Sequence, residues 1–154
     1  MDWFVRAFLK ASLVWLSLAV SLAVAMALVP SLTVYRTAHL HLALLGFVTQ
    51  MIYGVALHVI PRFFGQPLVH RRLAEVQWWC AQAGVSALAG GFLTRVHGFG
   101  GAASLMATGG MLSAIAAGSF VVNVWRTIDA SPMAAVHQKQ ARGGLPTLPQ
   151  ADAH

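Results

Sequence analysis

The run ASLVWLSLAVSLAVAMALVPSLTVY, at residues 11–35, decides the fold class of this chain. It contains no Asp, Glu, Lys or Arg, and a helix of about 20 such residues spans the hydrocarbon core of a bilayer. Three further runs of the same kind follow it. We therefore predict an all-α membrane protein, a bundle of four transmembrane helices at about residues 11–35, 39–61, 75–94 and 97–125.

The composition of the whole chain also excludes an ordinary soluble domain. Of 154 residues, 58% are hydrophobic and 9% are charged, whereas soluble domains carry about 25% charged residues. The basic start and the triplet Ala25-Met26-Ala27 also resemble a cleavable signal, although the apolar run is longer than the usual signal core. We expect one transmembrane domain over residues 1–126 and a mobile cytoplasmic tail over residues 127–154.

The net charge of +6 is distributed unevenly about the four predicted spans. One side carries Arg6, Lys10, Arg62, Arg71, Arg72, Arg126, Lys139 and Arg142, and the other carries Arg36 and Arg95. Because basic residues favour the cytoplasmic side, both termini are expected to be cytoplasmic, in the bacterial inner membrane. No basic soluble domain bearing aromatic residues is present, so nucleic-acid binding is not expected. The expected partner is the lipid bilayer.

Small residues recur every four positions on the third and fourth spans. They are Ala83, Ala87 and Gly91, and then Gly110, Ala114 and Gly118. Such stripes let helix backbones approach closely. They are typical both of contacts within one chain and of an interface between copies, and the spacing alone does not decide between the two. Gln50 and Thr49, near mid-membrane, are expected to form hydrogen bonds to other helices.

The second span carries three histidines, His39, His41 and His58. Residues two apart on a helix are rotated by about 200°, so His39 and His41 project from opposite faces. His58 lies about 28 Å further along the helix axis and belongs to a different environment. Ionisable side chains inside a membrane are costly, and they commonly ligate a cofactor or relay protons.

Imidazole is the usual axial ligand of heme b, which needs an apolar slot and a basic residue near its propionates. We therefore predict that His39 and His41 ligate heme iron. Arg36 and Arg95 are candidates to pair with propionates, or else anchor the chain at the interface. His97, expected at the start of the fourth span and at the same depth as the histidine pair, is a candidate second axial ligand.

The string His39-Leu40-His41, Gly54, His58, Pro61, Phe63, Gly65 and Leu68 resembles the tenth helix of the heme-copper oxidase catalytic subunit. The resemblance covers about thirty residues, a fifth of the chain. It implies that His39 is the proximal ligand of a high-spin heme, that His41 ligates a low-spin heme from the opposite face, and that His58 is not a metal ligand. The copper-ligand motifs of that family are absent, so the resemblance does not extend to oxygen reduction at a heme–copper pair.

That family's subunit has twelve helices in three arcs of four, and this chain supplies four. The resemblance therefore implies a homotrimer, in which His41 of one copy shares a heme with His39 of its neighbour. The expected function is electron transfer, which requires a redox partner, or binding of a small gas such as NO or O2. Two alternatives remain open: a copper or zinc protein using His39, His41 and His97, and a structural or assembly subunit of a respiratory complex in which the histidines hydrogen-bond between helices.

Overall fold

The computed structural model describes residues 2–130, which are almost entirely helical and contain no strand. In chain order the elements are α1 (Trp3–Leu28), a 3-10 helix η1 (Pro30–Tyr35), α2 (Arg36–His41), a π-helix η2 (Leu42–Thr49), α3 (Gln50–Phe63), α4 (Arg71–Val96) and α5 (Ala102–Asp129). The tail was predicted to begin at residue 127, but α5 continues to Asp129, and residues 131–154 lie outside the described residues. The all-α prediction is confirmed.

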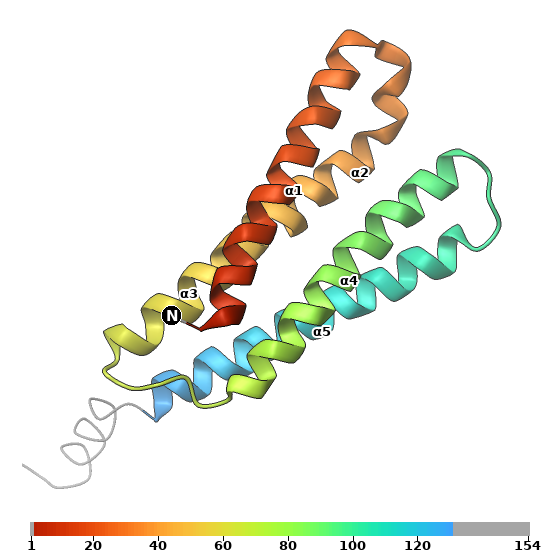
Figure 1. Cartoon of the computed structure of the whole chain (residues 1–154). Helices are drawn as coiled ribbons and strands as arrows, with labels where there is room; N and C mark the ends of the chain where they lie inside the picture. Colours follow the sequence, from red (N-terminus) through yellow and green to blue (C-terminus); the bar gives the residue numbers. More distant parts are fainter. Residues whose placement is uncertain (1, 131–154) are drawn as a thin grey trace, which may run out of the picture.

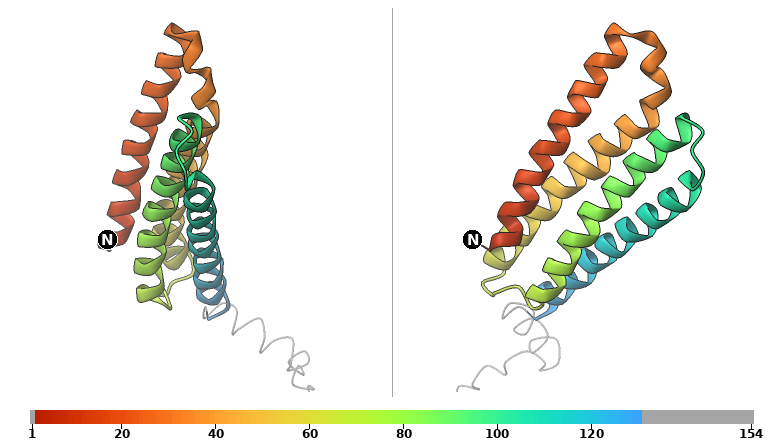
Figure 2. Two further views of the ribbon diagram at one scale, coloured as in Figure 1. Left: turned by 90° about the vertical axis from the view of Figure 1, so that its right-hand side faces the viewer. Right: turned by 45° about the vertical axis from the view of Figure 1, so that its right-hand side comes forward.

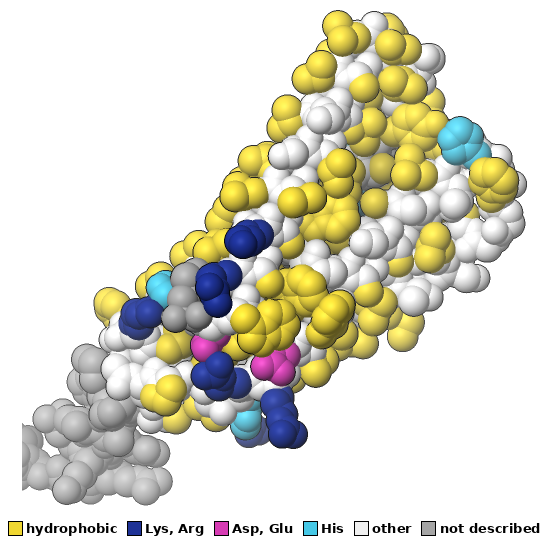
Figure 3. Space-filling view, viewed as in Figure 1, with side chains coloured by type: hydrophobic (Ala, Val, Ile, Leu, Met, Phe, Trp, Pro, Cys, Tyr) yellow, Lys and Arg dark blue, Asp and Glu magenta, His cyan; other side chains and the backbone are white. Residues whose placement is uncertain are grey.

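The elements form two helical hairpins that lie side by side (Figures 1 and 2). In the first hairpin, α1 packs against one continuous rod made of α2, η2 and α3. In the second, α4 packs along α5. We call the end with residues 2–6, 62–73 and 123–130 the terminal end, and the end with residues 28–37 and 94–102 the turn end. Charged side chains gather towards the terminal end of the face seen in Figure 3, and hydrophobic side chains are spread over the remainder.

Proline sets the first boundary. Val29 is extended, with φ −128° and ψ 93°, because the residue before a proline avoids the α-helical region. The predicted first span, 11–35, is therefore divided: α1 ends at Leu28, and the six residues that follow Val29 form the 3-10 helix η1. The helix also begins earlier than expected, at Trp3.

Glycine sets the last boundary. Gly98 and Gly101 have φ values of +70° and +86°, a left-handed conformation that glycine adopts at little cost. These residues turn the chain between α4 and α5, so the last helix starts at Ala102 and not at 97. His97 consequently caps the C-terminus of α4, and its predicted place at the start of the fourth span is wrong.

Three helical stretches are long and apolar enough to cross a membrane: Trp3–Leu28, Pro30–Phe63 and Ala102–Asp129. The helix α4 is as long as α1, but it carries three charged side chains in its first two turns and two glutamines, Gln77 and Gln82. The predicted membrane character thus rests on three helices, and the count of four spans stays a prediction.

Glycines close the contact between α4 and α5. A Cβ atom at Gly109 would lie 2.6 Å from the backbone nitrogen of Leu88, and one at Gly84 would lie 2.6 Å from Oγ of Ser113. In the predicted stripes, Gly91 takes part in this contact, against Met106. The stripe on α5 does not: Gly110 and Gly118 have nothing within 4 Å of an added Cβ, and Ala114 is exposed. This α5 stripe therefore faces outward from the chain.

Candidate functional site

His39 lies on α2 and its ring points towards α1. Its Nδ1 atom is 3.0 Å from the backbone carbonyl oxygen of Ala19. A carbonyl oxygen only accepts hydrogen bonds, so Nδ1 carries the proton and donates it. The neutral ring then has its free lone pair on Nε2, for which the described residues provide no hydrogen-bond partner. The side chain is half-buried.

His41 has the same arrangement on another side of the rod. Its Nδ1 atom donates to the backbone carbonyl oxygen of Thr37 at 2.9 Å, one turn earlier, which again leaves the lone pair of the neutral ring on Nε2. The ring packs against Phe92 of α4, with ring centroids 4.7 Å apart. One histidine therefore contacts α1 and the other contacts α4, as their rotation about a single helix predicts.

A π-helix begins directly after His41. It covers Leu42–Thr49, and the hydroxyl of Thr49 donates to the carbonyl oxygen of Leu44, five residues earlier. Gly46 lets this segment approach α1, since an added Cβ there would lie 2.7 Å from Cβ of Trp15. π-helical turns are rare and occur frequently at functional sites. The sequence did not predict this element, since the apolar run LALLGFVT offers no pattern that distinguishes a π-helix from an α-helix.

His97 does not lie with the other two histidines. Its Nε2 atom is 3.0 Å from the hydroxyl of Tyr35, and its ring is 6.2 Å from that of Phe99. The side chain is exposed at the turn end. The structure thus brings His97 to Tyr35. It does not bring His97 into contact with His39 or His41, so these histidines of one chain do not hold the same group.

The two arginines at the turn end are both exposed and have no ion pair within residues 2–130. Arg36 lies three residues before His39, and Arg95 lies three residues after Phe92, which contacts His41. Residues three apart share a helix face. Arg36 therefore shares a helix face with His39, and Arg95 shares one with Phe92, which packs on His41.

Among residues 2–130, no group of three or more His, Cys, Asp and Glu side chains lies close enough to hold a metal ion. His39, His41 and His97 are therefore not assembled into a copper or zinc site by this fold. A porphyrin differs from a bare ion here, because it needs only one or two axial nitrogens from the protein.

A polar chain crosses the middle of the bundle. Trp15 Nε1 donates to Gln82 Oε1 at 3.1 Å, and Gln82 Nε2 donates to Gln50 Oε1 at 2.6 Å, linking α1, α4 and α3. The predicted bond from Gln50 to another helix is confirmed. The one predicted for Thr49 is wrong, because its hydroxyl donates to Leu44 on its own rod. Closer to the terminal end of α4 lies Gln77, which is fully buried and has no partner for either side-chain polar atom in the described part of the chain.

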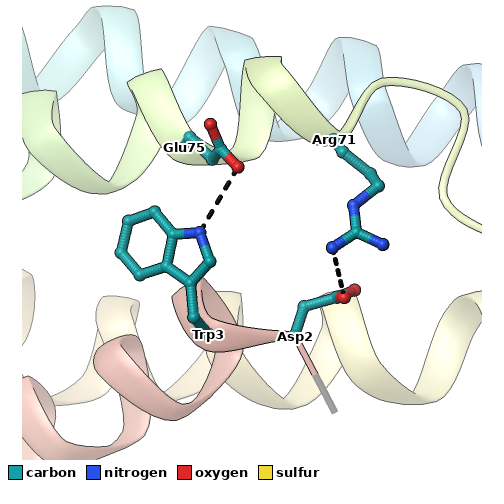
Figure 4. Close-up of polar contacts among 4 residues, drawn as sticks. All are labelled: Asp2, Trp3, Arg71 and Glu75. Carbon is teal, nitrogen blue, oxygen red and sulfur yellow. Dashed lines mark hydrogen bonds and ion pairs between the residues drawn. The ribbon is translucent and has the colours of Figure 1, made fainter.

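At the terminal end, polar side chains fasten the start of α1 to the start of α4 (Figure 4). Arg71 pairs with Asp2 at 2.7 Å, and Trp3 Nε1 donates to Glu75 at 3.3 Å. His58 contacts Arg62 on its own helix. These contacts lie at the opposite end of the bundle from His39 and His41, so His58 belongs to a separate environment.

No protein-family model matches this chain, and no curated protein matches it. The similarity to one helix of the heme-copper oxidases accordingly stays a prediction from the sequence.

Proposed function

We propose that this chain is a membrane heme b protein in which His39 and His41 are axial ligands through Nε2. The observation that carries the proposal is that the two imidazole rings form the same kind of hydrogen bond. Each Nδ1 donates to a backbone carbonyl oxygen, and neither Nε2 has a hydrogen-bond partner among residues 2–130. Metal-ligating histidines almost always donate the other ring N–H in this way, which fixes the ring's orientation and raises the basicity of the ligating nitrogen.

The other residues at the turn end fit the same group. Heme b carries two propionates; Arg36 lies on the helix that carries both histidines, and Arg95 lies on α4, which packs against that helix. Bound heme would supply a one-electron redox centre. The chain's own contribution is to hold two imidazoles at fixed orientations beside apolar helix surfaces and to neutralise the propionates.

In this proposal α4 also crosses the membrane, as the third of four spans in chain order. It packs along α5, which is apolar enough to cross a bilayer, and Gly84, Gly91 and Gly109 close the contact in the half nearer the turn end. A helix packed in this way covers the same depth as its neighbour. Of its two glutamines, Gln77 is fully buried and Gln82 is hydrogen-bonded to two other helices, so neither adds a polar surface for lipid. Both termini are then on one side, the cytoplasmic one by the excess of basic residues there.

We place the heme between copies of the chain, in a homotrimer. One rod cannot offer both histidines to one iron, because their rings point to different neighbours. The outward stripe Gly110-Ala114-Gly118 is a surface on which a second copy could pack closely. The trimer also matches the helix count of the family that the His-x-His segment resembles. His41 of one copy would then share a heme with His39 of the next.

The coordination state separates the two functions within this proposal. Two histidine ligands saturate the iron and favour electron transfer, whereas one open position permits binding of NO or O2. A reduced-minus-oxidised spectrum recorded with and without carbon monoxide distinguishes them. No spectral change with carbon monoxide supports electron transfer, and a shifted band supports gas binding.

The test is heme quantification by pyridine hemochrome on full-length protein purified from cells supplied with heme precursor. We expect about one heme per chain in the wild type, and loss of most of it in His39→Ala and His41→Ala. His58→Ala is the matched control, because it removes a histidine from the same rod at the terminal end. Helix content by circular dichroism verifies that each variant is folded.

A colourless wild-type preparation would refute the proposal, as would unchanged heme in both histidine variants. Metal quantification on the same samples covers the alternatives. Stoichiometric copper or zinc without heme indicates a metal protein, and neither heme nor metal indicates a structural subunit. Heme that remains bound after the oligomer is dissociated would contradict the shared site.

A further inference from the structure

A groove of about 780 Å³ lies at the terminal end, between the start of α4 and the last turns of α5. Its lining consists of Leu68, Val69, His70, Arg71, Arg72, Leu73, Val76, Val122 and Arg126. The groove is distinct from the histidine site, which lies towards the turn end. What it binds does not depend on whether the chain holds heme.

Two arginines from different helices line this groove without a counter-ion. Arg72 on α4 and Arg126 on α5 are exposed, and neither forms an ion pair within residues 2–130. The nearby acidic side chains have other contacts. Asp2 pairs with Arg71, and Glu75 accepts a hydrogen bond from Trp3 (Figure 4). Asp129 lines a different, apolar groove. Among residues 2–130, the groove therefore offers two arginines that are not held in an ion pair.

The backbone that forms the groove's side is held rigidly. Asn123 of α5 accepts a hydrogen bond from the backbone nitrogen of His70 at 3.2 Å and donates to its carbonyl oxygen at 3.0 Å. Thr127 accepts from the backbone nitrogen of Val69 at 3.3 Å. Both Asn123 and Thr127 are fully buried. The segment before α4 is thus fastened to α5, which fixes the backbone positions from which the two arginine side chains extend.

The apolar part of the groove lies deeper in the bundle than the charges. The helix α4 runs away from the terminal end, so Val76 lies one turn deeper than Arg72; α5 runs towards that end, so Val122 lies one turn deeper than Arg126. Val76 and Val122 are exposed, at 51% and 47%. A ligand filling this groove meets cations at the membrane surface and an apolar wall beneath them.

We infer that the groove binds one anionic phospholipid, with its phosphate between Arg72 and Arg126 and an acyl chain along Val76 and Val122. Charge complementarity selects an acidic headgroup, and basic pockets between membrane helices on the cytoplasmic side are suited to such lipids. The apolar wall selects a lipid over free phosphate, since phosphate alone would leave that wall uncovered. The wall also distinguishes this groove from arginines that only set the orientation of the chain.

The test is native mass spectrometry of the full-length protein in mild detergent, titrated with phosphatidylglycerol or with phosphatidylcholine of identical acyl chains. We expect tighter binding of phosphatidylglycerol. The double variant Arg72→Gln/Arg126→Gln should weaken that binding about 25-fold, because each arginine beside an anionic headgroup contributes about fivefold. The matched control is Arg6→Gln/Lys10→Gln, which removes two exposed basic residues from α1, outside the groove.

The control variant should bind phosphatidylglycerol as the wild type does, and inorganic phosphate at the lipid's concentration should not displace it. Equal losses in the two double variants would overturn the proposal, because they would mean diffuse attraction and no site. Equal binding of the two lipids, or displacement by phosphate, would also overturn it. All four positions are exposed, and circular dichroism verifies folding of each variant.

Discussion

Gly109 and Gly110 are neighbours on α5, but a side chain added at each position would meet different surroundings. A Cβ atom at Gly109 would lie 2.6 Å from the backbone nitrogen of Leu88 and 2.9 Å from the carbonyl oxygen of Gly84. Backbone atoms cannot rotate away, so Gly109→Ala must push α4 and α5 apart. A Cβ at Gly110 meets nothing within 4 Å.

The magnitude follows from comparing the two alanine variants. Alanine stabilises a helix interior over glycine by about 0.5–1 kcal/mol at both positions. Overpacking costs a further 1–3 kcal/mol, roughly, at Gly109 alone. The propensity gain cancels in the difference, so we expect Gly109→Ala to be about 1–3 kcal/mol less stable than Gly110→Ala.

The assay is reversible unfolding in mixed micelles with increasing sodium dodecyl sulfate, followed by circular dichroism, on both variants and the wild type. Gly110→Ala should unfold at or above the wild-type midpoint, and Gly109→Ala clearly below it. Stabilities of the two variants within about 0.5 kcal/mol of each other, smaller than the overpacking cost, would refute the close packing of α4 on α5.

Three other substitutions test separate features. Gly110→Leu should leave the stability of the single chain nearly unchanged but shift the sedimentation profile from oligomer to monomer, and an unshifted profile would exclude the outward stripe as an interface. Gln77→Leu should raise the free energy of unfolding by about 1–3 kcal/mol, because two buried polar atoms without partners are removed; a decrease would reveal a polar partner. Tyr35→Phe should leave the heme content unchanged, since its hydroxyl contacts His97 alone among the candidate ligands, whereas heme loss measured by pyridine hemochrome would return His97 to the site.

Hydropathy alone was enough to predict the helical class and the approximate location of each long helix within residues 2–130. The boundaries needed backbone chemistry that a count of apolar residues does not include. Pro30 lies inside the predicted first span and ends α1, and Gly101 delays the start of α5 to Ala102. Both signals were present in the sequence, since helices end before proline and glycine favours turns. The prediction for His97 was wrong because the glycines that follow it turn the chain, so His97 ends α4 and does not begin α5.

The directions of side chains could be predicted from the sequence only in part. Rotation about one helix was enough to separate His39 from His41, because both lie on the same short helix. The π-helix after them had no sequence signal, and it changes the register of all later residues of the rod relative to His41. Likewise, the four-residue spacing of Gly110, Ala114 and Gly118 identified a stripe but not its direction, since Gly109 forms the contact with α4.

Heme and oligomer are coupled thermodynamically if the cofactor joins two copies. His39 and His41 are oriented by carbonyl oxygens of their own chain, so each ring is ready before a second copy arrives, and association brings the second imidazole to the iron. By linkage, heme must then strengthen association by the same factor by which association strengthens heme binding. His39→Ala should consequently weaken both the retention of heme and the self-association of the chain. In Gly110→Leu the interface between copies is lost first, and the second heme ligand, which the other copy supplies, is lost as a result. If self-association in His39→Ala equals that of the heme-loaded wild type, the heme does not bridge the copies.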